Sequence, residues 1–131
     1  MFYNFEEEEE NNKLFQKIKD NFFDSFKEKM PQFNKGMWYL YVLELEYKKI
    51  YVGITNNPRK RIRNHFFGRG AVITEKFMPI EVLDIIECRP TREEVEQVEN
   101  DVTENLFNKY GYDNVFGGKY CNKKWLDLIR N

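Results

Sequence analysis

Two segments of the sequence carry residues whose types and spacing could do phosphate chemistry. In and just after residues 57–67, five basic residues occur with no acid between them: Arg59, Lys60, Arg61, Arg63 and Arg69. A cluster of this kind can neutralise phosphate groups and release their counterions. On charge alone, a solvated helix face explains the same cluster, so both interpretations stay open at this point.

Helical spacing divides this cluster into two groups. Arg61 and His65 lie one turn apart on one face and border the apolar Ile62 and Phe66. Arg59, Lys60 and Arg63 point away from that face. A guanidinium at the edge of a core is costly unless it meets an anion. A lone histidine in such a place is more often structural, so the pair indicates a site without proving one.

The second segment carries a carboxylate set apart from its neighbours. Val95, Val98, Val102 and Leu106 form the apolar stripe of a helix, and Glu99 falls about 40° from Val95, at the edge of that stripe. The other acids of the helix face solvent: Glu93, Glu94, Glu96, Asp101 and Glu104. A carboxylate that faces the sheet needs a cation. That cation is a metal ion or a basic side chain such as Arg61.

A small number of elements must position these residues. Alternating apolar side chains predict a strand over 38–45, a second over 50–54 and a third over 80–87. Asn57-Pro58 begins a helix that ends near Phe67, and the Thr91 capping box begins one that ends near Lys109. A loop then runs through Gly117-Gly118, and a short amphipathic segment follows near Trp125.

An appendage precedes this pattern. Leu14, Ile18, Phe22, Phe26 and Met30 recur every four residues and predict a helix over 11–30, after an acidic mobile tail over 1–10. The helix packs on the main domain, or forms a homodimer, or binds a partner protein. The expected fold class is α/β: a small sandwich with a three-stranded antiparallel or mixed sheet flanked by helices (β-β-α-β-α), plus the N-terminal helix. The predicted division is 1–36 and 37–131.

Composition sets the broad class. The 131 residues are 41% hydrophobic and 17% aromatic, which suffices for a packed core, and the net charge of −1 removes any simple argument from a basic protein to nucleic acid. The two cysteines are too few for a disulfide framework. No apolar run reaches the roughly 18 residues of a membrane span. We expect a protein that is not secreted and does not bind membranes. Its expected location is the cytoplasm, or the nucleus if the host is eukaryotic or the protein is viral.

Taken together, these residues resemble the GIY-YIG nucleases. Tyr39-Leu40-Tyr41 stands where the family has Gly-Ile-Tyr, and Tyr51-Val52-Gly53 is close to its second motif. Further matches are Arg61 with His65 four residues later, then Glu99, then Asn114 in Asp113-Asn-Val-Phe-Gly-Gly118. The resemblance covers about 80 residues and leaves out the first 36. Tyr39 replaces the motif's glycine, and the chain has no recognised DNA-targeting domain, which argues against a homing role.

The resemblance implies a DNA endonuclease that hydrolyses phosphodiester bonds with one Mg²⁺ or Mn²⁺ ion, and DNA as partner. It implies a catalytic set of Tyr41, Tyr51, Arg61, His65, Glu99 and Asn114, with Glu99 as metal ligand. Arg61 would hold the phosphate, Tyr41 would accept a proton, Tyr51 would orient the water, His65 would assist as base or hold Tyr41, and Asn114 would buttress the site. Backbone contacts would come from Arg59, Lys60, Arg63, Arg69 and Lys76. The alternative is a DNA- or protein-binding module that does not cleave.

Overall fold

The computed structural model describes residues 5–120, with side chains from Glu9 onward. The segment predicted near Trp125 lies outside these residues. Four α-helices and four strands occur in the order α1 (Phe5–Lys29), β1 (Trp38–Leu45), β2 (Lys49–Thr55), α2 (Pro58–Phe66), α3 (Val72–Lys76), β3 (Pro79–Arg89), α4 (Arg92–Tyr110) and β4 (Val115–Gly117). None of these helices is long and apolar enough to cross a membrane.

The four strands form one mixed sheet in the order β3-β1-β2-β4. Strand β1 pairs antiparallel with β2 and with β3, while β4 runs parallel to β2. The α/β class is confirmed, but the prediction of three strands is wrong. Strand β4 has three residues, too few to show the period of two that marks a strand, so the sequence indicated a loop there.

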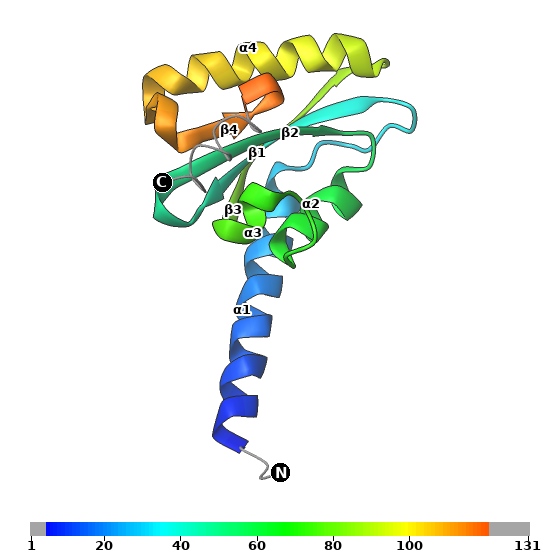
Figure 1. Cartoon of the computed structure of the whole chain (residues 1–131). Helices are drawn as coiled ribbons and strands as arrows, with labels where there is room; N and C mark the ends of the chain where they lie inside the picture. The colour runs from blue at the N-terminus through cyan, green and yellow to red at the C-terminus, as the bar shows by residue number, and fades with distance from the viewer. Residues whose placement is uncertain (1–4, 121–131) are drawn as a thin grey trace.

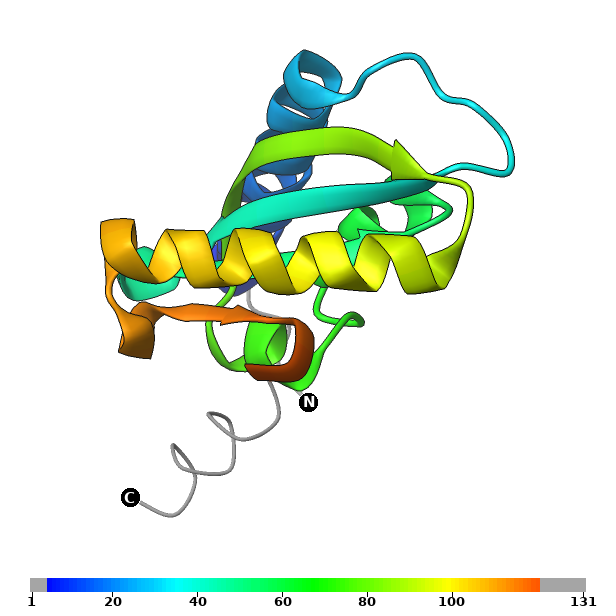
Figure 2. The ribbon, with the colours of Figure 1, turned by 90° about the horizontal axis from the view of Figure 1, so that it is seen from above.

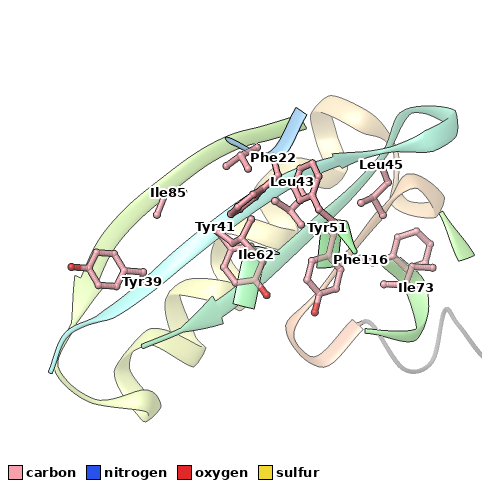
Figure 3. Close-up of a cluster of buried hydrophobic side chains, with 12 residues drawn as sticks. Phe22, Tyr39, Tyr41, Leu43, Leu45, Tyr51, Ile62, Ile73, Ile85 and Phe116 are labelled. Atoms are coloured by element: carbon pink, nitrogen blue, oxygen red, sulfur yellow. The ribbon is translucent and has the colours of Figure 1, made fainter. Parts of the chain in front are cut away.

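Helices cover both faces of the sheet (Figures 1 and 2). On one face, Tyr39, Tyr41, Leu43 and Leu45 of β1 pack with residues of α1, α2 and α3, and Figure 3 shows this cluster. On the other face, Leu40 and Val42 belong to a second cluster, against which side chains of α4 pack. The alternation along β1 therefore divided its residues between the two cores correctly.

Helix α1 begins earlier than the sequence analysis predicted. It starts at Phe5, so the acidic run Glu6–Glu10 is helical and the prediction of a tail through residue 10 is wrong. Glutamate is a good helix former, and acids near a helix N-terminus are stabilised by the helix dipole. Figure 1 shows the first half of α1 extending away from the sheet.

The second half of α1 belongs to the domain core. Phe22 is fully buried and its ring lies 5.6 Å from that of Phe66 in α2. Leu14 and Phe15 are more than half exposed. Packing of the helix on the domain is thus observed, while a homodimer or partner contact stays a prediction.

The predicted helix boundaries rest on real caps. The Asn57 side chain accepts a hydrogen bond from the Lys60 backbone N–H, and Pro58 occupies the first helical position of α2. The Thr91 side chain accepts from the Glu94 backbone N–H at the start of α4. Gly111, with φ of 92°, ends α4 in a backbone conformation that favours glycine. The short helix α3 had no counterpart among the predicted elements.

Candidate functional site

A cavity of about 440 Å³ opens at the end of β4, beside the part of β2 that continues past it. It draws residues from both layers of helices and from the sheet between them. Its lining consists of Tyr41, Tyr51, Gly53, Ile54, Arg61, Arg92, Glu96, Glu99, Asn100, Gly118 and Lys119. Four residues that sequence reasoning selected, from four different elements, therefore meet in one place.

Tyr41 and His65 form the buried side of this site. Tyr41 is 1% exposed and His65 is fully buried, and the Tyr41 Oη lies 2.7 Å from His65 Nε2. On its other side the imidazole contacts Thr74, with 2.9 Å between Nδ1 and Oγ1. Tyr51 packs its ring 4.9 Å from that of His65. Figure 3 shows Tyr41 and Tyr51 within the apolar cluster.

Two glycines make room for this pair. A Cβ atom on Gly53 would collide with the phenol of Tyr41, and one on Gly70 would collide with the imidazole of His65. Residue 53 pairs directly with Tyr41 across the β1–β2 ladder. The glycine of Tyr51-Val52-Gly53 is therefore required by space, since any side chain would occupy the position of the Tyr41 hydroxyl.

Burial keeps both groups neutral. Loss of solvent raises the pKa of Tyr41 well above its ordinary value, and the neighbouring Tyr51 raises it further, against the opposing effect of Arg61. Burial also lowers the pKa of His65 to about 3, with a further contribution from the Arg61 charge. At neutral pH the protein therefore holds a phenol hydrogen-bonded to an uncharged imidazole.

Glu99 turns toward the interior, as its helical phase predicted. It is half-buried, whereas Glu93, Glu94, Glu96, Asp101 and Glu104 are exposed. Burial raises its pKa to about 7, against the opposing effect of the Gly118 backbone. The ion pairs within the described residues do not include one between Glu99 and Arg61. Arg61 shares the cavity with Glu99 but does not neutralise it.

The other basic side chains selected from the sequence do not line the cavity. Exposed positions are occupied by Arg59, Lys60, Arg63, Arg69 and Lys76. The Arg63 guanidinium lies over the ring of Phe67 at 5.3 Å from its centroid. For α2 this agrees with the prediction from helical spacing. Arg61 is the one arginine of the helix that faces the sheet, and Arg59 and Arg63 face solvent.

Asn114 is not brought to the cavity. Its Nδ2 donates to the Tyr110 backbone carbonyl, and its Oδ1 accepts from Lys49 Nζ at 2.8 Å. Lys49 begins β2, whereas the cavity lies beyond the other end of the β2–β4 pairing. The role proposed for Asn114 in supporting the catalytic set therefore has no contact behind it. In this structure the residue joins the end of α4 to β2.

Part of the cavity lining was not predicted from the sequence, namely Arg92, Asn100 and Lys119. Asn100 Oδ1 accepts the backbone N–H of Lys119, which fixes the residues that follow β4 against α4. Arg92 forms a 3.0 Å ion pair with Glu96, four residues along the same helix. The spacing of this pair was visible in the sequence. The position of Lys119 beside α4 depends on β4, which the sequence did not reveal.

Comparison with known proteins agrees with the resemblance to the GIY-YIG nucleases. The family model of the GIY-YIG catalytic domain matches residues 37–111. Among curated proteins, a UPF0213 protein of Cupriavidus necator is 46% identical over 46 residues, 35% of this chain and 50% of that protein. One from Bacillus licheniformis is 39% identical over 61 residues, 47% of this chain and 62% of that protein.

A UPF0213 protein of Neisseria meningitidis serogroup A is 38% identical over 47 residues, 36% of this chain and 52% of that protein. The chain thus spans about half to three fifths of the length of the curated relatives it matches. No solved structure matches the chain.

Proposed function

Because this chain belongs to the GIY-YIG family, a family of nucleases, we propose that it is a DNA endonuclease that hydrolyses phosphodiester bonds with the help of a divalent metal ion. The observation that carries the proposal is the shared cavity of Tyr41, Tyr51, Arg61 and Glu99. These side chains provide proton-transfer groups, a cation and a hard oxygen ligand within one open space. Phosphodiester hydrolysis needs all three.

Arg61 is the group that binds the scissile phosphate. Its guanidinium is half-buried in the cavity and has no ion pair among the described side chains, so an incoming phosphate supplies the anion that its position lacks. As charge builds on the phosphate, the fork of donors stabilises it. Away from the chemistry, Arg59, Lys60 and Arg63 on the exposed side of α2 contact the DNA backbone.

Glu99 is suited to hold a metal ion. Its carboxylate is half-buried, its pKa is raised to about 7, and no basic side chain of the described residues forms an ion pair with it. No group of three or more His, Cys, Asp or Glu side chains that could hold a metal occurs within that part of the chain. One carboxylate fits Mg²⁺, which keeps several waters and takes phosphate oxygens from its substrate. A bound ion would neutralise charge on the leaving oxygen.

Tyr41 and His65 move the proton. Tyr41 takes a proton from the attacking water while its own phenolic proton passes to His65 Nε2, 2.7 Å away. Burial and the Arg61 charge both oppose a charged imidazole. Binding of a phosphate to Arg61 offsets the second of these effects, so DNA itself raises the basicity of His65. Tyr51, which lines the cavity beside Tyr41, orients the water.

The test is cleavage of supercoiled plasmid with Mg²⁺, Mn²⁺ or EDTA. Cleavage is expected only with metal, and Glu99→Gln and Arg61→Ala are expected to reduce it about a hundredfold or more. Glu93→Gln is the matched control, because it removes an exposed carboxylate from the same helix outside the cavity. If all three variants cut DNA equally well, Glu99 and Arg61 are not part of the active site.

A panel of duplex, nicked, branched and single-stranded DNA defines the substrate in the same assay. Tight binding of any of these without cleavage in either metal would replace the endonuclease by the non-cleaving module. Titration of the panel by fluorescence anisotropy separates these two outcomes.

A further inference from the structure

Thr74 is a fully buried polar residue that the proposed function leaves without a role. It lies in α3 and its hydroxyl meets three partners. The Ala71 backbone N–H donates to Thr74 Oγ1 at 3.1 Å, the Ala71 carbonyl oxygen lies 3.0 Å from it, and His65 Nδ1 lies 2.9 Å from it. No pattern in the sequence pointed to a connection between Thr74 and His65.

The Thr74 hydroxyl has one proton and two groups that could accept it: His65 Nδ1 and the Ala71 carbonyl, which also accepts the Glu75 backbone N–H at 3.1 Å. A hydroxyl donates one proton and accepts through two lone pairs. The Ala71 N–H can only donate, and its carbonyl can only accept. If Thr74 gives its proton to that carbonyl, the third partner, His65 Nδ1, must donate to Thr74. His65 Nε2 then carries no proton and accepts from the Tyr41 hydroxyl.

The opposite tautomer leaves a donor unused. With the proton on His65 Nε2, that nitrogen would donate to the Tyr41 oxygen, and His65 could no longer accept the phenolic proton. The phenolic proton of Tyr41 would then be buried with no acceptor among the residues that the structure describes. An unsatisfied buried donor is costly. The arrangement with the proton on Nδ1 satisfies every group.

We propose that Thr74 is a positioning residue that holds the proton of His65 on Nδ1, so that the free Nε2 accepts the phenolic proton of Tyr41. Its consequence for catalysis rests on the proposed function. When Tyr41 gives its proton to Nε2, His65 becomes an imidazolium whose Nδ1–H still donates to Thr74. Thr74 acts through His65 and touches neither substrate nor metal, which is the role of the orienting partner in other histidine sites.

The first experiment measures the tautomer directly. The sequence contains one histidine, so the ring-nitrogen signals in a ¹⁵N-labelled sample belong to His65 alone. A long-range ¹H–¹⁵N spectrum of the wild-type protein at neutral pH is expected to show a protonated Nδ1 and an unprotonated Nε2. A proton on Nε2 would overturn the proposal, and this result needs no variant to fold.

Substitutions then test the part played by Thr74. Thr74→Ser keeps the hydroxyl and is expected to keep the wild-type nitrogen signals. Thr74→Val keeps the shape and removes the acceptor, so the proton is expected to distribute between the two nitrogens. Thr103→Val is the matched control: it also removes a fully buried hydroxyl, one whose partner is the Glu99 carbonyl oxygen, and is expected to leave His65 unchanged.

Kinetics separate this proposal from the proposed function. Thr74→Val is expected to lower kcat about tenfold or more with KM unchanged, and Thr74→Ser is expected to restore it. Unaltered tautomer and kcat in Thr74→Val would show that Thr74 is only structural. If wild-type protein shows the predicted tautomer but cleaves no DNA, the endonuclease proposal fails and the assignment of the tautomer stands. If it cleaves with Nε2 protonated, the reverse holds.

Discussion

Acidification is expected to destabilise the protein through a single buried group, His65. Its pKa is about 3 in the folded chain, against an ordinary value of 6.5. The unfolded chain therefore binds more protons than the folded one between these values, and the free energy of unfolding falls as the pH falls through 6.5. The change is about 2 kcal/mol between pH 7 and pH 5. Because pH 5 still lies above the folded pKa, the size depends chiefly on the unfolded value.

Glu99 has the opposite effect. Its pKa rises from 4.5 to about 7 on folding, so the folded state binds the extra proton and unfolding becomes harder as the pH falls from 7 toward 4.5. The side chain borders an open cavity, so solvent screening reduces its contribution to about 1 kcal/mol over the same interval. The wild-type protein therefore shows the sum of two opposing terms, and only variants separate them.

The assay is urea unfolding at pH 5, 6 and 7 in EDTA for the wild type, His65→Gln and Glu99→Gln. His65→Gln is expected to lose about 2 kcal/mol less than the wild type between pH 7 and pH 5. Glu99→Gln is expected to lose about 1 kcal/mol more. Each variant differs from the wild type at one residue only, and no second histidine is present. The same pH dependence in the wild type and His65→Gln would refute a buried, neutral imidazole.

Three further changes test other parts of the structure. Gly53→Ala is expected to destabilise the protein by about 1–3 kcal/mol by urea unfolding, because its methyl group collides with the Tyr41 phenol. Asn114→Ala is expected to cost about 1–2 kcal/mol of stability through its lost hydrogen bonds while kcat stays unchanged. Phe22→Ala is expected to cost about 3–5 kcal/mol, because its side chain is fully buried, while the more exposed Phe15→Ala costs less than about 1 kcal/mol.

For each of these three predictions, one outcome would contradict the physical reason given. If Gly53→Ala costs as much stability in a Tyr41→Ala background, which removes the colliding ring, as it does in the wild type, the clash is not the cause. A large loss of kcat in fully folded Asn114→Ala would return that residue to the catalytic set. Equal costs for Phe22→Ala and Phe15→Ala would show that α1 does not pack on the sheet as observed.

Local chemistry made much of the fold predictable. Asn57 with Pro58 and Thr91 with Glu94 mark helix starts within a few residues, because a cap satisfies backbone groups of its own first turn. The alternation along β1 assigned its side chains to the correct faces, since side chains of a strand alternate whatever the strand pairs with. Errors occurred where that local signal is short or overridden, at β4 and at the start of α1.

The candidate site, too, was predictable in some of its residues and not in others. The angular position of Glu99 around α4 was enough to predict that it faces the sheet. The angular positions around α2 separated Arg61 and His65 from the exposed basic side chains. The contacts of Asn114 were not accessible to such reasoning. Asn114 matched the family's late asparagine in the order of the motifs, but its hydrogen bonds go to Tyr110 and Lys49, away from the cavity.

By itself, the sequence determined where helices begin and which residues of each helix or strand face the interior, because caps and periodicity are properties of a single element. Only the tertiary structure decided which of these residues meet. It placed Glu99 and Arg61 in one cavity without pairing them, and brought Thr74 against His65. It also made Gly53 necessary, through the space that Tyr41 takes up on the neighbouring strand. Such contacts depend on how separate elements pack, and no local pattern encodes them.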